Sequence, residues 1–166
     1  MELKDYLETN KTAVLNLGCG RICPPSHFGI DAEDHDGVDM VCDLTNGIPI
    51  DDNTFDTVWA KDFLEHIPQG EPCIKMMEEI YRVLKPGGSL HLDVPSTDGG
   101  GIGAFGHPQH VSWWSKTTIK YYLDDEYTGG WRASIGAKCH FIPISILTYW
   151  NDHNMPYVDA ELKKKD

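Results

Sequence analysis

Two glycines and a nearby acid are the first residues of this sequence whose types and spacing can bind a ligand. The turn Gly18-Cys19-Gly20 follows the apolar run Val14–Leu17, and Asp31 follows the next apolar run, which starts at Phe28. Glycine lets a backbone turn sharply and approach a ligand closely, and a carboxylate accepts hydrogen bonds from ribose hydroxyls. The order of strand, glycine turn, strand and acid is typical of the start of a nucleotide-binding α/β unit.

The segment between the two apolar runs is too short and too rich in proline for the helix that such a unit normally has. It is seven residues long, Arg21–His27, and includes Pro24 and Pro25. Because proline cannot occupy a helix interior, we expect the helix after the first strand to be missing. A dinucleotide places its pyrophosphate at the N-terminus of that helix, and Cys23 stands where its third glycine is expected. These features argue against NAD.

S-adenosylmethionine carries no phosphate, so the loss of the helix costs it less. It needs a glycine turn near its methionine and sugar parts, an acid for its ribose and a contact for adenine. Arg21 follows the turn directly and can hold the cofactor carboxylate in a bidentate pair. A solvated surface arginine is the alternative interpretation of Arg21.

Short apolar runs bounded by turn residues predict the strands that position these groups. They lie at Val14–Leu17, Phe28–Ile30, Val38–Cys42, Phe55–Ala60 and Ser89–Val94. Their composition is typical of strands buried on both faces of a parallel sheet. Between the fourth and fifth runs, an apolar stripe predicts a helix that begins near residue 72 and ends before 86.

The C-terminal part of the chain predicts a change of architecture. A glycine-rich loop follows the fifth run, and a helix is expected near Ser115–Leu123. Two further runs, 131–150 and 155–165, read as a hairpin joined by the turn Asn151-Asp152-His153-Asn154. The expected fold is α/β and Rossmann-like, with a doubly wound, mostly parallel sheet and a C-terminal antiparallel β-hairpin.

Five segments resemble, in order, the signature segments of class I S-adenosylmethionine-dependent methyltransferases. They read LNLGCG, GIDAED, VCDL, FDTVWAKDFLEHI and VLKPGGSLHLDVP, and they span about residues 12–95. The resemblance implies that Asp31 holds the ribose and that Asp43 meets the adenine, although Asp43 can instead form an Asx turn. With Arg21 included, the expected cofactor-binding residues are Gly18, Cys19, Gly20, Arg21, Asp31, Ala32, Asp43, Leu44, Ala60 and Lys61.

Histidines near the same sheet edge are candidate catalytic bases, because imidazole titrates near neutral pH. The resemblance places His66 near the cofactor mouth, and His110 lies in the glycine-rich loop. A turn cap is the alternative role for His66, and packing before Trp113 is the alternative for His110. The spacing of His107 and His110 suits a metal, but no third ligand is identifiable nearby in the sequence. We therefore expect no metal site.

A narrower resemblance covers the rest of the chain. The segments HPQHVSWW and NMPYVDAELKKK are similar to small methyltransferase-like proteins of bacteriophages and surface-polysaccharide gene clusters. Such proteins usually have Asp-Pro-x-His where this chain has His107, so a role for that aspartate does not carry over.

Composition limits the class of protein and of partner. A chain of 166 residues suits one domain, 1–166, and a net charge of −12 disfavours a broad grip on nucleic acid. The charged N-terminus does not resemble a signal peptide, and no apolar run is long enough to cross a bilayer. Five cysteines without paired spacing indicate reduced thiols and a cytoplasmic protein.

The function expected from these features is methyl transfer from S-adenosylmethionine to a small molecule, a sugar or a nucleotide. The tetrapeptide typical of enzymes that methylate exocyclic amines of DNA bases is absent, because Lys61-Asp62-Phe63-Leu64 stands in its place. The alternative function is that of an S-adenosylmethionine-binding module without transfer activity, acting as a sensor or as a partner subunit.

Overall fold

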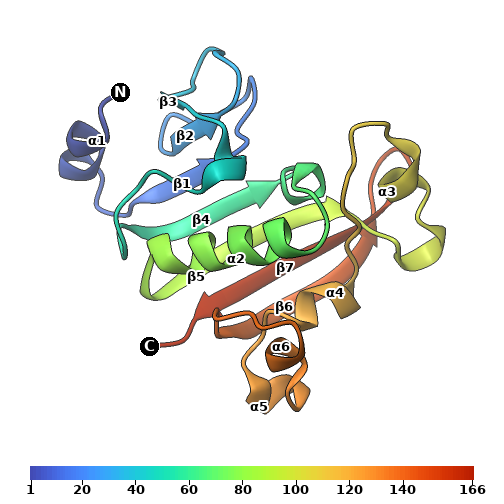
Figure 1. Ribbon diagram of the computed structural model, residues 1–166. Coiled ribbons are helices and arrows are strands. Elements are labelled where there is room, and N and C mark those ends of the chain that lie inside the picture. The colour runs from blue at the N-terminus through green and yellow to red at the C-terminus, as the bar shows by residue number, and fades with distance from the viewer.

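The apolar runs form one seven-stranded sheet in the computed structural model, which describes residues 1–166 (Figure 1). The strand order is β3-β2-β1-β4-β5-β7-β6; the first five strands are parallel, and β7 runs antiparallel to both β5 and β6. The expected mostly parallel sheet with a terminal antiparallel hairpin is confirmed. The strands are β1 (Val14–Leu17), β2 (Phe28–Asp31), β3 (Met40–Val41), β4 (Phe55–Lys61), β5 (Leu84–Pro95), β6 (Phe141–Trp150) and β7 (Pro156–Lys164).

The helix after β1 is missing, as the prolines predict, and a loop of residues 21–27 takes its place. Tyr6 holds this loop. It lies on α1 (Leu3–Thr9), which the sequence reading did not anticipate, and its ring is fully buried. The Tyr6 hydroxyl accepts the N–H of Val14 at 2.8 Å and lies 2.8 Å from the carbonyl oxygen of Ser26. One side chain therefore ties α1, β1 and the end of the loop together.

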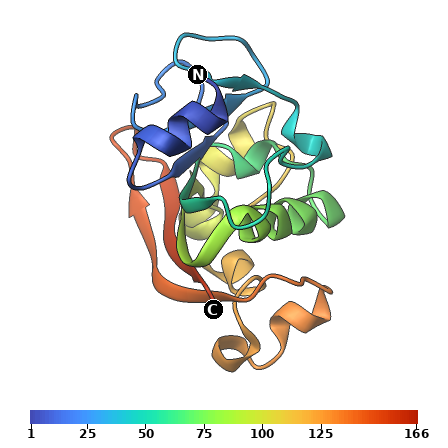
Figure 2. The same cartoon turned by 90° about the vertical axis from the view of Figure 1, so that its left-hand side faces the viewer.

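The central strands are buried on one face only, whereas the sequence predicts strands that are buried on both faces. Val58 and Ala60 on β4 are fully buried, whereas Trp59 between them is 39% exposed. Figure 2 shows α2 (Glu71–Val83) on one side of the sheet. On the other side, the loop covers only part of the face, where the ring of His27 lies 5.7 Å from that of Trp59. The expectation was wrong here because the missing helix leaves this face open to solvent.

Helix α2 is where the apolar stripe predicts it, and Pro72 lies in its first turn. Its buried side chains pack on the sheet, but Pro86-Gly87-Gly88 does not separate the helix from the next strand. β5 begins at Leu84 directly after the helix, five residues earlier than expected, because Leu84 already pairs with Phe55 of β4. Gly87 provides the positive φ of 72° within this extended start of the strand.

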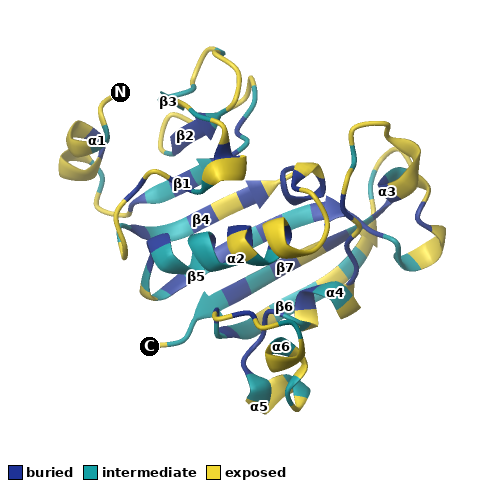
Figure 3. Cartoon of the chain, viewed as in Figure 1, coloured by how far each residue is buried: buried dark blue, intermediate teal, exposed yellow.

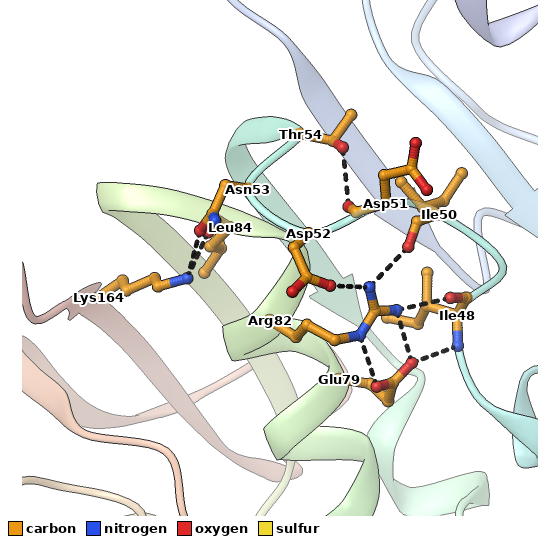
Figure 4. A network of polar contacts seen from close by, with 10 residues as sticks. All are labelled: Ile48, Ile50, Asp51, Asp52, Asn53, Thr54, Glu79, Arg82, Leu84 and Lys164. Atoms are coloured by element: carbon orange, nitrogen blue, oxygen red, sulfur yellow. Dashed lines mark hydrogen bonds and ion pairs between the residues drawn. The ribbon is translucent and has the colours of Figure 1, made fainter.

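Arg82, near the end of α2, fixes the segment that precedes β4 (Figure 4). Its guanidinium donates to both carboxylate oxygens of Glu79 at 2.7 and 2.8 Å, and to Asp52 at 2.8 Å. It also donates to the carbonyl oxygens of Ile48 and Ile50, at 2.8 and 2.7 Å. These bonds hold residues 48–52 against the helix. The turn of residues 44–46, which lines a cavity described below, comes shortly before this segment.

The segments after β5 are short and mostly helical. The glycine-rich loop contains a helix, α3, that was not expected, and residues 131–134 form α6 instead of the start of a hairpin strand. The hairpin strand begins only at Phe141, because Gly129 and Gly130 with left-handed φ angles of 66° and 102° set up the α6 turn. The elements are η3 (Asp98–Gly100), α3 (Ile102–Gly106), α4 (Lys116–Lys120), α5 (Asp125–Thr128) and α6 (Trp131–Ser134).

The core is one cluster of 34 buried residues from the sheet, from α2 and from the segments around them. Figure 3 shows buried positions along the central strands. Trp114 is fully enclosed at 1% exposure, whereas Trp113 is 43% exposed, so only one of the two adjacent tryptophans anchors the core. All five cysteines are free thiols, and no helix has the length and apolar character needed to cross a membrane.

Candidate active site

The glycine turn ends β1 in a conformation that glycine adopts readily. Gly18 and Gly20 have φ angles of +61° and +56°. The ring of Phe63 lies so close to Gly18 that an added Cβ would meet its Cδ2 atom at 2.7 Å. Asp31, at the end of β2, accepts the N–H of Gly20 at 2.8 Å and that of Glu33 at 3.0 Å. The predicted pairing of glycine turn and acid is therefore a direct contact in the fold.

The first of three adjoining cavities opens between the glycine turn and the ends of β2 and β3. Its volume is about 530 Å³, and it brings together three predicted cofactor residues from separate elements, Gly18, Asp31 and Leu44. Ala32 also lines it. The sequence reading missed Thr45 and Phe63 on its wall. Leu44 and Thr45 lie on the turn η1 (Leu44–Asn46). The segment 48–52, which Arg82 holds, comes shortly after this turn in the chain.

Asp43 does not line this cavity, and its side chain caps η1. Its carboxylate accepts the N–H and the hydroxyl of Thr45, at 3.0 and 2.6 Å, and these hydrogen bonds lower the pKa of Asp43. The alternative interpretation, an Asx turn, describes this geometry. Asp43 therefore acts on the site by shaping the turn that presents Leu44 and Thr45.

The second cavity lies on the other side of Gly18 and has a volume of about 760 Å³. Three of the residues predicted to bind the cofactor, Cys19, Arg21 and Lys61, line it. Arg21 is exposed, and the ammonium of Lys61 lies 3.5 Å from the carboxylate of Asp93. Ala60 lines none of the three cavities, because its side chain is fully buried in the sheet.

Asp62 is the residue at which the cavities meet, and the sequence reading passed over it. It lines the first, second and third cavities. It directly follows β4 with a φ of +48°, a left-handed conformation that costs a non-glycine residue energy. Its N–H donates to the carbonyl oxygen of Asp93 at 2.8 Å, which anchors it at the end of the strand.

The third cavity, of about 490 Å³, lies beyond the carboxyl ends of the strands, next to α3. Glu65 and His66 reach it from the turn η2 (Leu64–His66), and His107, His110 and Tyr157 complete its polar wall. Such a position, outside the carboxyl ends of parallel strands, is where α/β sheets bind ligands. Both predicted catalytic histidines therefore line one cavity, adjacent to the two beside the glycine turn.

Backbone hydrogen bonds bring His110 to η2. The N–H groups of Val111 and Ser112 both donate to the carbonyl oxygen of Glu65, at 2.9 and 3.2 Å. As a result, the ring of His110 lies 5.2 Å from that of His66, and His107 stacks on His110 at 4.5 Å. Nδ1 of His66 lies 3.3 Å from the carbonyl oxygen of Gln109.

Glu65 is the least expected member of the cavity. It is only 2% exposed, and its Oε2 atom has no hydrogen-bond partner. Burial, with a smaller effect of the nearby carboxylates Asp62 and Asp93, raises the pKa of Glu65 to about 8. Loss of solvent in the cavity also lowers the pKa of His66, which favours its neutral form. The expectation that no further ligand lies near His107 and His110 was wrong, because folding places Glu65 and His66 beside them.

Comparison with known proteins gives a family likeness for part of the chain. Residues 26–92 match the family model described as a methyltransferase domain, so this segment is similar to methyltransferase domains. The solved structure of an S-adenosylmethionine-dependent methyltransferase from Archaeoglobus fulgidus superposes on the chain with a TM-score of 0.68 and 16% identity, over 97% of this chain and 89% of that one. At such low identity, the superposition establishes the fold alone.

Two further proteins that are similar to this chain are methyltransferases with named substrates. Burkholderia thailandensis 1,6-didemethyltoxoflavin-N1-methyltransferase, solved with 1,6-didemethyltoxoflavin and S-adenosylhomocysteine bound, superposes with a TM-score of 0.66 and 17% identity over 99% of this chain and 75% of that one. Cycloartenol-C-24-methyltransferase 1 of Oryza sativa subsp. japonica is 46% identical over 55 residues, 31% of this chain and 15% of that protein. The chain spans 15% or less of the curated relatives that it matches. The resemblance to phage and polysaccharide-cluster proteins stays a prediction.

Proposed function

We propose that this protein binds S-adenosylmethionine in the first and second cavities and transfers its methyl group to an acceptor in the third. The acceptor class that we propose is a small molecule, a sugar or a nucleotide. The observation that carries the proposal is the junction at Asp62, where all three cavities meet at the carboxyl ends of the parallel strands. A cofactor that fills the first two cavities can present its reactive group to the third.

The residues on each side of Gly18 suit different parts of the cofactor. In the first cavity, Asp31 offers a carboxylate to the ribose hydroxyls, and Leu44 and Thr45 offer an apolar and a polar contact to adenine. In the second cavity, Arg21 is free to bind the carboxylate of the methionine part, because its guanidinium has no protein partner. This division supports the cofactor-binding roles expected from the sequence for Asp31, Leu44 and Arg21. It does not support the adenine contact expected for Asp43.

Transfer requires alignment and exclusion of water more than acid or base chemistry. The acceptor atom attacks the methyl carbon, the bond from that carbon to sulfur breaks, and S-adenosylhomocysteine is the product. An oxygen or nitrogen acceptor must also release a proton, and His66 and His110 face the third cavity, where that proton appears. Three residues of α3, Ile102, Gly103 and Gly106, line this cavity, so a shift of α3 towards the acceptor would reduce the access of water to it.

Binding without transfer is the second candidate function, and an exposed apolar stretch of the sheet edge favours it. Ile144 and Leu147 of the outer strand β6 are 55% and 60% exposed and line none of the three cavities, so they offer a surface to a partner subunit. The two functions differ in one assay. Purified protein is incubated with S-adenosylmethionine and pools of acceptors, and S-adenosylhomocysteine is quantified. Tight binding without product in every pool favours the module over the enzyme.

Cofactor binding is tested by calorimetry with S-adenosylmethionine and S-adenosylhomocysteine. Asp31→Ala removes charge-assisted hydrogen bonds to the ribose and to Gly20, so we expect a loss of about 1.5–3 kcal/mol, which is roughly ten- to a hundredfold in Kd. Asp34→Ala is the matched control, since Asp34 is exposed in the same segment and lines none of the three cavities. Equal affinity in wild type and Asp31→Ala would remove the ribose assignment.

A further inference from the structure

Three side chains that can bind a metal ion converge in the third cavity. One ligand atom each from Glu65, His66 and His110 lies within 4.8 Å of the other two. Glu65 and His66 are adjacent in η2, whereas His110 comes from the loop that the Glu65 carbonyl oxygen holds by two backbone hydrogen bonds. Backbone pairing between the two segments therefore brings the buried Glu65, the exposed His66 and the half-buried His110 together.

Glu65 lacks the partner that a buried carboxylate needs. Glu65 is only 2% exposed, and no protein group donates a hydrogen bond to its Oε2 atom. An ionised carboxylate in such surroundings is strongly disfavoured unless a cation compensates its charge. No lysine or arginine lines this cavity to supply that charge, and the charged residues beside Glu65 are the acids Asp62 and Asp93.

Each of the two histidines has one ring nitrogen beside a backbone carbonyl oxygen. Nδ1 of His110 lies 3.0 Å from the carbonyl oxygen of Ala104, and Nδ1 of His66 lies 3.3 Å from that of Gln109. A carbonyl oxygen only accepts, so in each ring Nδ1 carries the proton and donates it. Nε2 is then left with a free lone pair. Histidine ligands of metal ions usually donate their second ring N–H in this way, which fixes tautomer and ring orientation.

We propose that Glu65, His66 and His110 form a binding site for a divalent transition-metal ion, with Zn²⁺ as the representative ion. Two imidazoles and one carboxylate suit zinc, cobalt, iron and manganese, whereas magnesium and calcium prefer oxygen ligands alone. Bonds of about 2.1 Å bring neighbouring ligand atoms to roughly 3.5 Å, so the side chains must close by about an ångström. Gly103 and Gly106 in α3 make the segment before His110 adaptable enough for this change.

The position of the site assigns it a use that rests on the proposed methyl transfer. An ion bound there lies in the acceptor cavity, next to the junction at Asp62, with positions open for ligands from the acceptor. A hydroxyl group bound to such an ion loses its proton more easily. The acceptor class that fits is therefore an oxygen compound able to bind a metal. An imidazole bound to the ion cannot also be the base, so metal binding replaces that role of His66 and His110.

Metal binding is tested without any methyl acceptor. Tag-free protein is stripped with a chelator and titrated with Zn²⁺ by calorimetry and with Co²⁺ by visible absorption. We expect one equivalent to bind and the melting temperature to rise with Zn²⁺. Glu65→Gln keeps the size of the side chain but removes the anionic ligand, and we expect at least tenfold weaker binding. His110→Ala should weaken binding by at least as much.

The matched control is His153→Ala, which removes an exposed histidine of the β6–β7 turn and should bind Zn²⁺ as wild type does. The absence of saturable binding in wild type would overturn the proposal, and so would unchanged affinity in His110→Ala. His110 lies in a loop, where a substitution disturbs folding less than at the buried Glu65. The Zn²⁺ affinity of His110→Ala therefore tests the proposal even if Glu65→Gln fails to fold. Because the readout is metal binding, a protein that binds Zn²⁺ but transfers no methyl group would refute the proposed function and leave the metal site standing.

Discussion

At the scale of single residues, the tight space beside Gly18 distinguishes two glycines with the same backbone conformation. A Cβ at Gly18 would meet the Phe63 ring at 2.7 Å, whereas a Cβ at Gly20 would have no atom within 4 Å. Gly20→Ala should therefore cost only the strain of a positive φ, about 1–2 kcal/mol. Gly18→Ala should cost about 1–3 kcal/mol more, because Phe63 must move. Denaturant unfolding measures both, and equal losses would contradict the steric account.

Arg21 is the residue that we expect to replace the missing helix N-terminus in binding the cofactor carboxylate. Arg21→Ala should weaken S-adenosylmethionine binding by about 1.5 kcal/mol, or roughly tenfold, through the loss of a charge-assisted pair. Methylthioadenosine lacks the carboxylate, so its affinity should not change. Lys11→Ala, which removes an exposed cation outside the second cavity, is the control for a general effect of charge. Equal losses for both ligands would rule out this role.

At the scale of elements, the loop of residues 21–27 connects β1 and β2 in place of a helix, and Tyr6 holds the end of this loop. The Tyr6 hydroxyl accepts the N–H of Val14 and contacts the carbonyl oxygen of Ser26 in a part-buried place. Tyr6→Phe removes this shared partner, so we expect a loss of about 1–3 kcal/mol in the free energy of unfolding. Tyr127→Phe on α5, where the tyrosine is 47% exposed, should change stability by less than about 0.5 kcal/mol.

Tyr6→Phe should also change the affinity for the cofactor, because Tyr6 holds the loop that lines the cofactor site. Arg21 and Ile22 line the second cavity and lie in the segment that Tyr6 fastens. Tyr6→Phe should therefore weaken S-adenosylmethionine binding several-fold, while Tyr127→Phe should not. Unchanged cofactor affinity together with lower stability would mean that the loop keeps its shape without this tether.

At the scale of the whole molecule, excess negative charge acts against the compact state. The chain has 26 acidic residues against 14 basic ones, a net charge of −12. Self-repulsion extends over about 30 Å at 10 mM salt but only about 8 Å at 150 mM. The melting temperature should therefore rise with NaCl across this range, whereas a matched osmolarity of glycerol should not reproduce the salt dependence. A melting temperature that falls with salt would show that ion pairs such as Lys85–Asp56 dominate over the repulsion.

The sequence by itself determined those features that depend on neighbours along the chain. Pro24 and Pro25 exclude a helix wherever the loop lies, and the glycines of the turn and Asp31 are close enough in sequence to imply contact across adjacent strands. The apolar stripe of α2 and the existence of β4 were readable for the same reason, whereas the burial of β4 on one face only was not. The Asp43 side chain was ambiguous, because a capped turn and an adenine contact need the same residue at the same place.

Only the tertiary structure decided which side chains share a cavity. Glu65 and His110 are 45 positions apart, and the two backbone hydrogen bonds that join their segments leave no pattern in the sequence. Asp62 likewise gained its place at the junction of three cavities from a strained turn at the end of β4. The physical reason is that backbone pairing between distant segments depends on the whole sheet being formed, whereas turns, caps and helix breaks depend on a few adjacent residues.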